Sequence, residues 1–170
     1  IQIKNVHGKE DTLITIQIDF QLAERFGMTY VDAEGQTKYP YVIHRTSIGC
    51  YERTLALLLE KYAGALPTWL MPEQVRVLPI SDRLIDDAKK VEEQLSRAGI
   101  RVSCDTRSEK VGYKIREAQL EKIPYMLVIG DKEVEEGTVS VRSRKEGDLG
   151  SMPVEGFLSK ILQEIATKAK

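Results

Sequence analysis

The stretch DTRSEKVGYKIREAQLEKIPYMLVIGDKEVEEGTVSVRSRK, residues Asp105–Lys145, decides the fold of the second half of the chain. Its apolar run, Tyr125–Ile129, has the length and composition of a buried strand. Polar segments that carry both signs of charge flank this run on either side. A surface that merely attracts nucleic acid would be one-sided in charge, so the pattern fits either a surface that reads a ligand or a well-solvated one.

The composition of the whole chain narrows the class of protein. The 170 residues carry a net charge of −1 and can form one large domain or two small ones. Cys50 and Cys104 lie far apart in the sequence, which fits a reduced cytoplasmic protein better than a disulfide scaffold. No apolar run reaches the roughly 18 residues that a membrane span needs, so we expect no membrane partner. Because the sequence opens at Ile1 in an alternating pattern, we expect a piece of a longer protein.

Outward from Tyr125–Ile129, strand-like and helix-like segments alternate. The other expected strands are Val75–Pro79, Arg101–Cys104 and Thr138–Arg142, and the expected helices are Asp82–Ala98, Gly112–Lys122 and Val154–Ala169. Such alternation implies right-handed parallel crossovers and a sheet that is covered by helices. The second half is therefore predicted to be an α/β domain.

The first half has a different pattern. Two antiparallel hairpins are expected, Ile1–Val6 with Thr12–Phe20 and Tyr30–Asp32 with Tyr39–Ile43. A helix is expected at Cys50–Ala63, with a stripe of apolar residues that should face a core: Leu55, Leu58, Leu59 and Tyr62. The residues that could bind a metal, His7, His44, Cys50 and Cys104, have no ligand spacing and cannot complete a site by themselves.

Two polar faces in the second half are open to more than one interpretation. On the helix Gly112–Lys122, Arg116 falls inside the apolar arc and Lys114 lies opposite, so Arg116 forms either a structural ion pair or an RNA contact. On the strand Thr138–Arg142, alternation turns Val139 and Val141 to the core. The other face, which carries Thr138, Ser140, Arg142 and Arg144, is either solvated or suited to phosphates and base edges.

Six segments, taken in order, resemble one family. They are TIQIDF (Thr15–Phe20), HRTSIGCYER (His44–Arg53), AGALPTWLMPEQV (Ala63–Val75), AGIRVSCDTRSEKVGYKIREAQ (Ala98–Gln119), IPYMLVIGDKEVEEGTVSVRSR (Ile123–Arg144) and GDLGSM (Gly147–Met152). The series is similar to the C-terminal part of bacterial threonyl-tRNA synthetases, which are class II aminoacyl-tRNA synthetases. The resemblance covers essentially the whole chain.

The resemblance implies roles for individual residues on the catalytic side. Arg53 corresponds to the arginine of the third class II motif, which contacts ATP and acts in catalysis. Thr15 and Gln17 correspond to residues that line the adenylate pocket. His44 corresponds to one of three protein ligands of a zinc ion that recognises threonine by its amino and hydroxyl groups, and so rejects valine. Two departures, Thr12 in place of a pocket Gln and Cys50 in place of Ser, are expected to reshape the active-site wall.

The resemblance also implies the domains, the ligand and the partners. The expected domains are the end of a class II catalytic domain with antiparallel β/α structure (residues 1–66), a linker (67–74) and an anticodon-binding domain with a mixed sheet covered by helices (75–170). The anticodon readers would be Ser108, Lys110, Arg116, Lys132, Glu133 and Arg142. The implied partners are threonine tRNA, threonine, ATP with magnesium, zinc and a second subunit of a homodimer.

Three functions were weighed. The first is a threonine–tRNA ligase, of which this chain alone would be inactive. The second is a non-catalytic paralogue or fragment that binds tRNA or mRNA. A small-nucleotide site in the α/β half is disfavoured because no Gly-rich phosphate loop follows its first strand.

Overall fold

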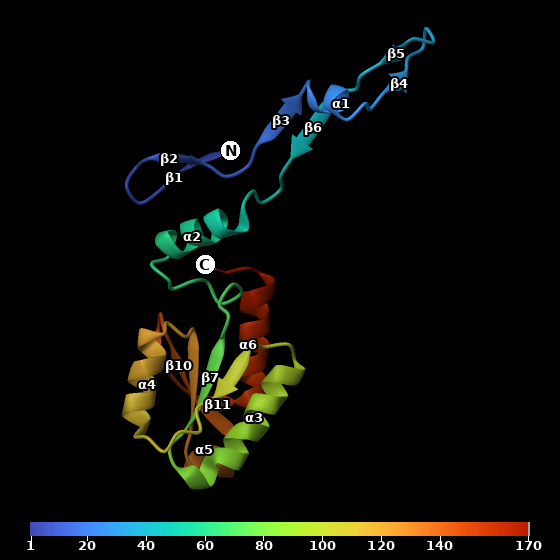
Figure 1. Cartoon of the computed structure of the whole chain (residues 1–170). Helices are drawn as coiled ribbons and strands as arrows, with labels where there is room; N and C mark the ends of the chain where they lie inside the picture. The colour runs from blue at the N-terminus through green and yellow to red at the C-terminus, as the bar shows by residue number, and fades with distance from the viewer. Residues whose placement is uncertain (170) are drawn as a thin grey trace. The chain divides into compact units, whose positions relative to one another are not determined.

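The computed structural model describes residues 1–169. The chain divides into two compact units, Ile1–Ala63 and the part that begins at Gly64 (Figure 1). No helix in the described residues is long and apolar enough to cross a membrane. Each unit is described by itself below.

The first unit consists of three two-stranded ribbons and two helices. The ribbons pair β1 (Gln2–Lys4) with β2 (Glu10–Thr12), β3 (Ile16–Asp19) with β6 (Val42–Arg45), and β4 (Tyr30–Val31) with β5 (Thr37–Lys38), all antiparallel. The helices are α1 (Leu22–Arg25) and α2 (Tyr51–Lys61). The hairpin prediction was thus partly wrong, because Thr12–Phe20 is not one strand. Thr12 ends β2, which pairs with β1, and Ile16 begins β3, which pairs with β6.

The apolar residues of the first unit find little cover. Ala23 is the one residue of Ile1–Ala63 that is fully buried. On the β3–β6 ribbon, Ile16 is 68% exposed and Ile43 is 65% exposed. The predicted core stripe of α2 is also wrong in part, since Leu55 and Leu59 lie at the surface. Ile43 pairs across the ribbon with Ile18, which is itself 56% exposed, so the apolar side chains of this ribbon are not buried within their own unit.

The second unit is built on one five-stranded mixed sheet. Its strand order is β11-β10-β9-β7-β8, with β7 (Val75–Pro79) at the junction, parallel to both β8 (Val102–Cys104) and β9 (Tyr125–Ile129). β10 (Thr138–Ser143) is antiparallel to β9, and β11 (Gly147–Pro153) is antiparallel to β10. The predicted mixed sheet and parallel crossovers are confirmed, whereas β11 was not predicted.

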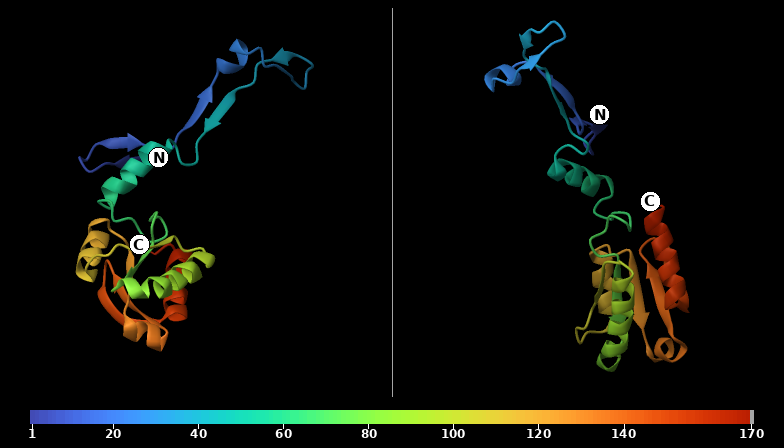
Figure 2. Two further views of the ribbon diagram at one scale, coloured as in Figure 1. Left: turned by 60° about the horizontal axis from the view of Figure 1, so that its bottom comes forward. Right: turned by 90° about the vertical axis from the view of Figure 1, so that its right-hand side faces the viewer.

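Helices cover the two faces of this sheet and make two cores. A 3-10 turn (η1, Asp82–Leu84) leads into α3 (Ile85–Arg97), and α6 (Val154–Ala166) ends the unit. Ala88 and Leu95 of α3 and Phe157 of α6 pack on one face of the sheet. On the other face, Ala118 of α4 (Val111–Leu120) packs with Leu78 and Met126. The left view of Figure 2 shows α4 on one side of the unit and α3 with α6 on the other. The short helix α5 (Asp131–Glu136), which was not predicted, precedes β10.

The segment that enters the second unit is held by two arginines. Arg101 donates to the carbonyls of Trp69 and Met71, and Arg144 donates to those of Ala65 and Leu66. Burial lowers the pKa of Arg144. The guanidinium of Arg144 therefore has a structural role, whereas the sequence pattern left its strand face open to solvent or to a ligand.

Candidate nucleic-acid interface

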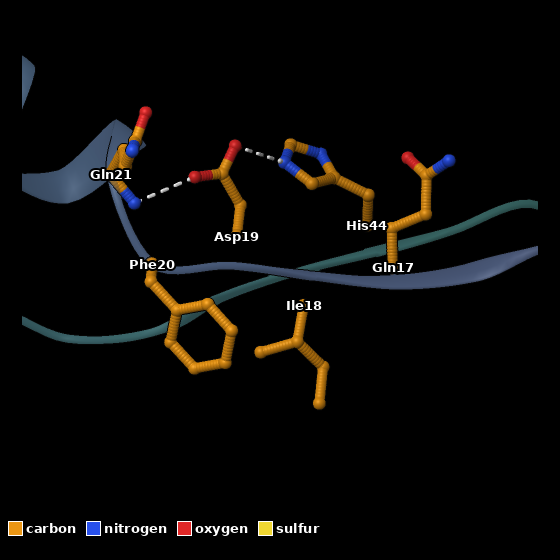
Figure 3. A pocket seen from close by; sticks show the side chains of 6 residues that line it. All are labelled: Gln17, Ile18, Asp19, Phe20, Gln21 and His44. Atoms are coloured by element: carbon orange, nitrogen blue, oxygen red, sulfur yellow. Dashed lines mark hydrogen bonds and ion pairs between the residues drawn. The ribbon is translucent and has the colours of Figure 1, made fainter.

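The adenylate-side residues of the first unit gather on the β3–β6 ribbon. Gln17 and His44 are cross-strand partners in the ladder. Figure 3 shows Gln17, Asp19 and His44 on one face of the ribbon, with Ile18 and Phe20 on the other. With Gln21 these residues line an open hollow of about 550 Å³. The ribbon therefore sorts its side chains into a polar face and an apolar face.

Asp19 supports His44 within this hollow. The Nε2 atom of His44 lies 3.5 Å from Oδ2 of Asp19. The other carboxylate oxygen of Asp19 accepts the backbone N–H groups of Gln21 and Leu22, both at 2.8 Å, and these bonds hold the pKa of Asp19 below its usual value. A carboxylate beside a ring nitrogen is the usual support of a histidine that binds a metal, so His44 suits the predicted role of one zinc ligand. Residues 1–169 contain no group of three side chains that could hold a metal.

Arg53 lies in the first turn of α2 and is tied to the first hairpin. Its Nη1 donates to the carbonyl of Thr12 at 2.9 Å. Just before α2, Gly49 has a φ of +80°, and a Cβ there would lie 2.0 Å from the carbonyl oxygen of Leu13. Thr15 meets this region from the other side, since its backbone N–H lies 3.5 Å from Oγ1 of Thr46. The structure therefore ties Arg53 to the hairpin that precedes β3.

Three loops of the second unit meet at the carboxyl edge of its parallel strands. In an open α/β sheet this edge is where ligands bind, beside the point at which the strand order reverses. The loop after β8 carries two predicted readers, Ser108 and Lys110. The hydroxyl of Ser108 donates to Asp82, in the loop after β7, at 3.1 Å. Lys110 lies at the start of α4 and is exposed.

Lys114 closes the core beneath these loops. It is 3% exposed, and its Nζ donates to the carbonyl of Pro79 at 3.3 Å and to that of Asp105 at 3.0 Å. These two carbonyls follow neighbouring parallel strands, so the amine ties the strand ends together. The prediction for α4 was wrong on this point: Lys114 is buried, whereas Arg116 lies at the surface.

An ion-pair network fixes the loop after β8. Arg107 donates to both carboxylate oxygens of Asp105, at 2.9 and 2.6 Å, and also pairs with Glu117 of α4 at 2.6 Å. The bonds from Arg107 lower the pKa of Asp105, whose side chain is 5% exposed. The loop that carries Ser108 and Lys110 is thus anchored at its first residues.

Glu133, a predicted reader, is held from two sides. Its Oε2 accepts the backbone N–H of Gly130 at 3.0 Å, and its Oε1 accepts the hydroxyl of Ser151 at 3.3 Å. A Cβ at position 130 would lie 2.7 Å from the same carboxylate, so a larger residue there would require the Glu133 side chain to move. Lys132, beside it, is exposed and lies 4.0 Å from Glu136.

Arg142 lies on the polar face of β10, as predicted. Its neighbours along the strand, Val141 and Ser143, are buried on the opposite face. The guanidinium is 38% exposed and donates to Oδ2 of Asp148 at 3.0 Å. Because Ser140 pairs with Ser151 and Arg142 with Asp148, the contacts of Glu133 and of Arg142 fall at successive positions along β10–β11. Two of the predicted readers, Glu133 and Arg142, therefore contact neighbouring parts of the same hairpin.

Arg116 is exposed, and its side chain has no hydrogen bond or ion pair among residues 1–169. The structural ion pair that the sequence left open as one alternative is therefore not formed. Tyr113 and Leu120, one helical turn to either side, are 47% and 70% exposed. The sequence pattern predicted that the apolar arc of α4 faces the core, but part of this arc lies at the surface.

Asp148, Ser151 and Asp19 were not singled out as site residues. Asp148 and Ser151 were missed because β11 was missed: Gly147, Gly150 and Pro153 interrupt the alternation that marks a strand. Asp19 was missed because its pairing with His44 depends on a partner strand, β6, that the sequence pattern assigned to another hairpin.

Two family models match the chain. The model described as the anticodon binding domain matches residues 74–164, and the one described as the tRNA synthetase class II core domain (G, H, P, S and T) matches residues 2–62. The two matches follow the division of the chain into two units.

Curated relatives and a solved structure agree with these matches. The chain is 64% identical to a threonine–tRNA ligase of Clostridium perfringens over 99% of its length, and 57% identical to one of Caldanaerobacter subterraneus over 98%. It spans 26% of the length of either relative. A crystal structure of the RNA binding domain of threonyl-tRNA synthetase from Cryptosporidium parvum matches 95% of this chain and 41% of its own, with a TM-score of 0.79 and 36% identity.

Proposed function

The chain belongs to the threonyl-tRNA synthetase family, and from that membership we propose that it is the tRNA-recognising part of a threonine–tRNA ligase. The whole enzyme would activate threonine with ATP and transfer it to threonine tRNA. The second unit would read the anticodon. The proposed readers are Ser108, Lys110, Arg116, Lys132, Glu133 and Arg142.

The observation that carries this proposal is the polar line along β10 and β11. Unpaired anticodon bases expose their Watson–Crick edges, and a carboxylate accepts from such an edge where a guanidinium donates to it. Glu133 and Arg142 supply one group of each kind, and both are fixed by neighbours of the same unit. A balanced pair of this kind also explains why the surface is not simply basic.

The exposed face of α4 adds a second kind of contact. Arg116 lies there between the exposed ring of Tyr113 and the exposed side chain of Leu120. Aromatic rings and guanidinium planes both stack on unpaired bases, and this stacking tolerates every base. We therefore assign to Arg116 an RNA contact.

The first unit would supply part of the adenylate site. Arg53 would place a positive charge against ATP, which binds with magnesium, while Thr15 and Gln17 would line the pocket. His44, supported by Asp19, would be one ligand of zinc, with the others outside this chain. When bound, the zinc would supply a contact to the amino and hydroxyl groups of threonine. The 170 residues alone are expected to be inactive.

The proposal extends to the setting of the enzyme. We expect a homodimer in the cytoplasm. The second candidate function is a paralogue that binds tRNA or mRNA without catalysis. The departures at Thr12 and Cys50 favour this candidate, because they would reshape the active-site wall. The encoded polypeptide separates the two, because the enzyme requires upstream zinc ligands and an upstream class II motif with its own arginine.

The test compares RNA binding of Arg142→Ala and Glu133→Ala with that of the unchanged chain. Each variant is expected to lose about 1–3 kcal/mol of binding free energy for the anticodon stem-loop of threonine tRNA. A stem-loop with a scrambled anticodon should bind the variants and the unchanged chain alike. Fluorescence anisotropy at one fixed salt concentration measures both.

Glu135→Ala is the matched control for Glu133→Ala, because Glu135 is an exposed glutamate of the same helix. It should leave both affinities unchanged. An equal loss toward both stem-loops in the Arg142 or Glu133 variant would show contact with the RNA backbone and would refute base reading at that residue.

A further inference from the structure

A β-bulge lies in the hairpin that carries Arg142. The ladder between β10 and β11 pairs Val139 with Met152 and Val141 with Gly150, and then shifts, so that Arg142 pairs with Asp148. Leu149 is the extra residue and has no ladder partner. Gly150 adopts a φ of +77°, a conformation that glycine adopts without strain.

The bulge decides which side chain meets Arg142. Side chains alternate between the two faces of a strand, so an uninterrupted ladder would place Leu149 opposite Arg142 and turn Asp148 to the core face. The extra residue reverses this order. Leu149 packs instead against the apolar core, and Asp148 faces the guanidinium. Bulges are found next to functional sites because they re-aim a side chain in this manner.

Asp148 is itself fixed by the bulge. Its Oδ1 accepts a hydrogen bond from the backbone N–H of Gly150 at 2.9 Å, and its Oδ2 accepts one from Nη2 of Arg142 at 3.0 Å. A guanidinium carries five N–H donors. Asp148 is the one partner of the Arg142 side chain among residues 1–169, so its remaining donors are available to a ligand.

We propose that Asp148 is a positioning residue, which the bulge brings opposite Arg142 so that the guanidinium is already oriented when RNA binds. The inference rests on the proposed role of Arg142 as an anticodon reader. Orientation before binding matters because each rotamer-rich side chain that becomes fixed in a complex costs affinity, and a pre-oriented one avoids that cost.

Stability alone does not account for this ion pair. Arg142 and Asp148 are 38% and 53% exposed, and ion pairs with that degree of exposure contribute little to folding. A carboxylate on a surface that binds a polyanion also repels the ligand. Its presence there is explained if it orients Arg142, and removal of Asp148 should leave the fold intact.

The experiment is a double-mutant cycle in the 170-residue chain, with Asp148→Ala, Arg142→Ala and the combined variant. The readout is the ratio of affinities for the threonine anticodon stem-loop and its scrambled counterpart. Asp148→Ala is expected to lower this ratio roughly fivefold, in the range of couplings between contacting residues. In the Arg142→Ala background the same change should leave the ratio unaltered. Loss of one negative charge would tighten both RNAs equally and so cannot lower the ratio.

Two further variants test whether the effect is specific to the contacts of Asp148. Asp148→Asn keeps one acceptor oxygen, which can serve Gly150 or Arg142 but not both in the observed geometry, and should restore only part of the ratio. Glu93→Ala removes the partner of Arg97 from a more exposed ion pair on α3 and should leave the ratio unchanged.

The outcomes separate the inference from the function on which it rests. If Arg142→Ala lowers the ratio and Asp148→Ala does not, the positioning role is refuted and the anticodon function stands. If Asp148→Ala lowers the ratio equally in both backgrounds, Asp148 acts without Arg142 and the inference also fails. If Arg142→Ala itself leaves the ratio unchanged, base reading by Arg142 is refuted.

Discussion

Asp105 shows how a single buried carboxylate couples the loop after β8 to pH. Arg107 lowers the pKa of Asp105, so the carboxylate contributes stability above the ordinary Asp pKa of about 3.9. This contribution is lost as the pH falls through the lowered pKa of the folded state. Asp105→Asn should therefore destabilise the second unit at neutral pH, and the difference from the unchanged chain should shrink in acid.

Urea unfolding at about pH 7 and about pH 3 measures this difference, since the two conditions bracket the unfolded-state value. Glu135→Gln, an exposed carboxylate of α5, serves as the control and should show no such change. A cost of Asp105→Asn that is equal at both pH values would contradict the assignment of Arg107 as the main partner.

The burial of Lys114 and the exposure of Arg116 could not be predicted from the sequence. Both lie on α4, and helical periodicity placed the lysine outside and the arginine inside. The structure reverses them because two carbonyls at the strand ends satisfy the Lys114 amine, and sequence periodicity does not register partners of that kind. The polar face of β10 was predictable because a strand alternates with a fixed period of two, whatever its partners.

At the scale of elements, Gly150 is the residue on which the β10–β11 hairpin depends. A Cβ there meets no atom within 4 Å, so the cost of Gly150→Ala is backbone strain at a φ of +77°. We expect the free energy of unfolding of the second unit to fall by about 1–2 kcal/mol. The affinity ratio for the two stem-loops should fall as well, because relief of the strain would displace Asp148.

Gly112→Ala is the matched control, since Gly112 lies inside α4 without a positive φ and also has open space at its Cβ. Alanine in a helix should stabilise by about 0.5–1 kcal/mol. Chemical denaturation of both variants measures the two effects. A Gly150→Ala variant as stable as the unchanged chain would show that the bulge does not require glycine.

The elements that the sequence predicted are those with a strong apolar period. β7, β9, α3 and α6 each present a continuous core face and were expected at nearly their observed bounds. α5 was missed because it is short and polar, and β11 was missed because Gly147, Gly150 and Pro153 interrupt its alternation. These two elements hold Glu133, Asp148 and Ser151, so part of the candidate site was out of reach of sequence periodicity.

At the scale of the whole molecule, the two units differ in how well they can fold alone. Residues from Gly64 onward bury two apolar clusters around a five-stranded sheet, whereas residues 1–63 fully bury Ala23 alone. A polypeptide of residues 64–170 should unfold cooperatively in urea with a dispersed amide spectrum. A polypeptide of residues 1–63 should show neither, because its exposed Ile16, Ile18 and Ile43 gain no burial.

Circular dichroism and heteronuclear NMR on the two separate polypeptides provide the measurement. Cooperative unfolding of residues 1–63 by themselves would contradict this expectation. The two family models divide the chain at the same place. One covers residues 74–164 as an anticodon binding domain, and the other covers residues 2–62 as a class II core domain.

The extra residue in β11 gives the length of one hairpin a diagnostic value. The number of residues between Val141 and Met152 sets the register of the ladder, and the register decides which side chain faces the arginine. At the present length, a regular ladder would place Leu149 opposite the arginine, and the bulge prevents this. A relative that lacks Leu149 would pair its carboxylate with the arginine in a regular ladder. When family members are compared, a gap at this position would therefore mark a member whose carboxylate faces the arginine without a bulge.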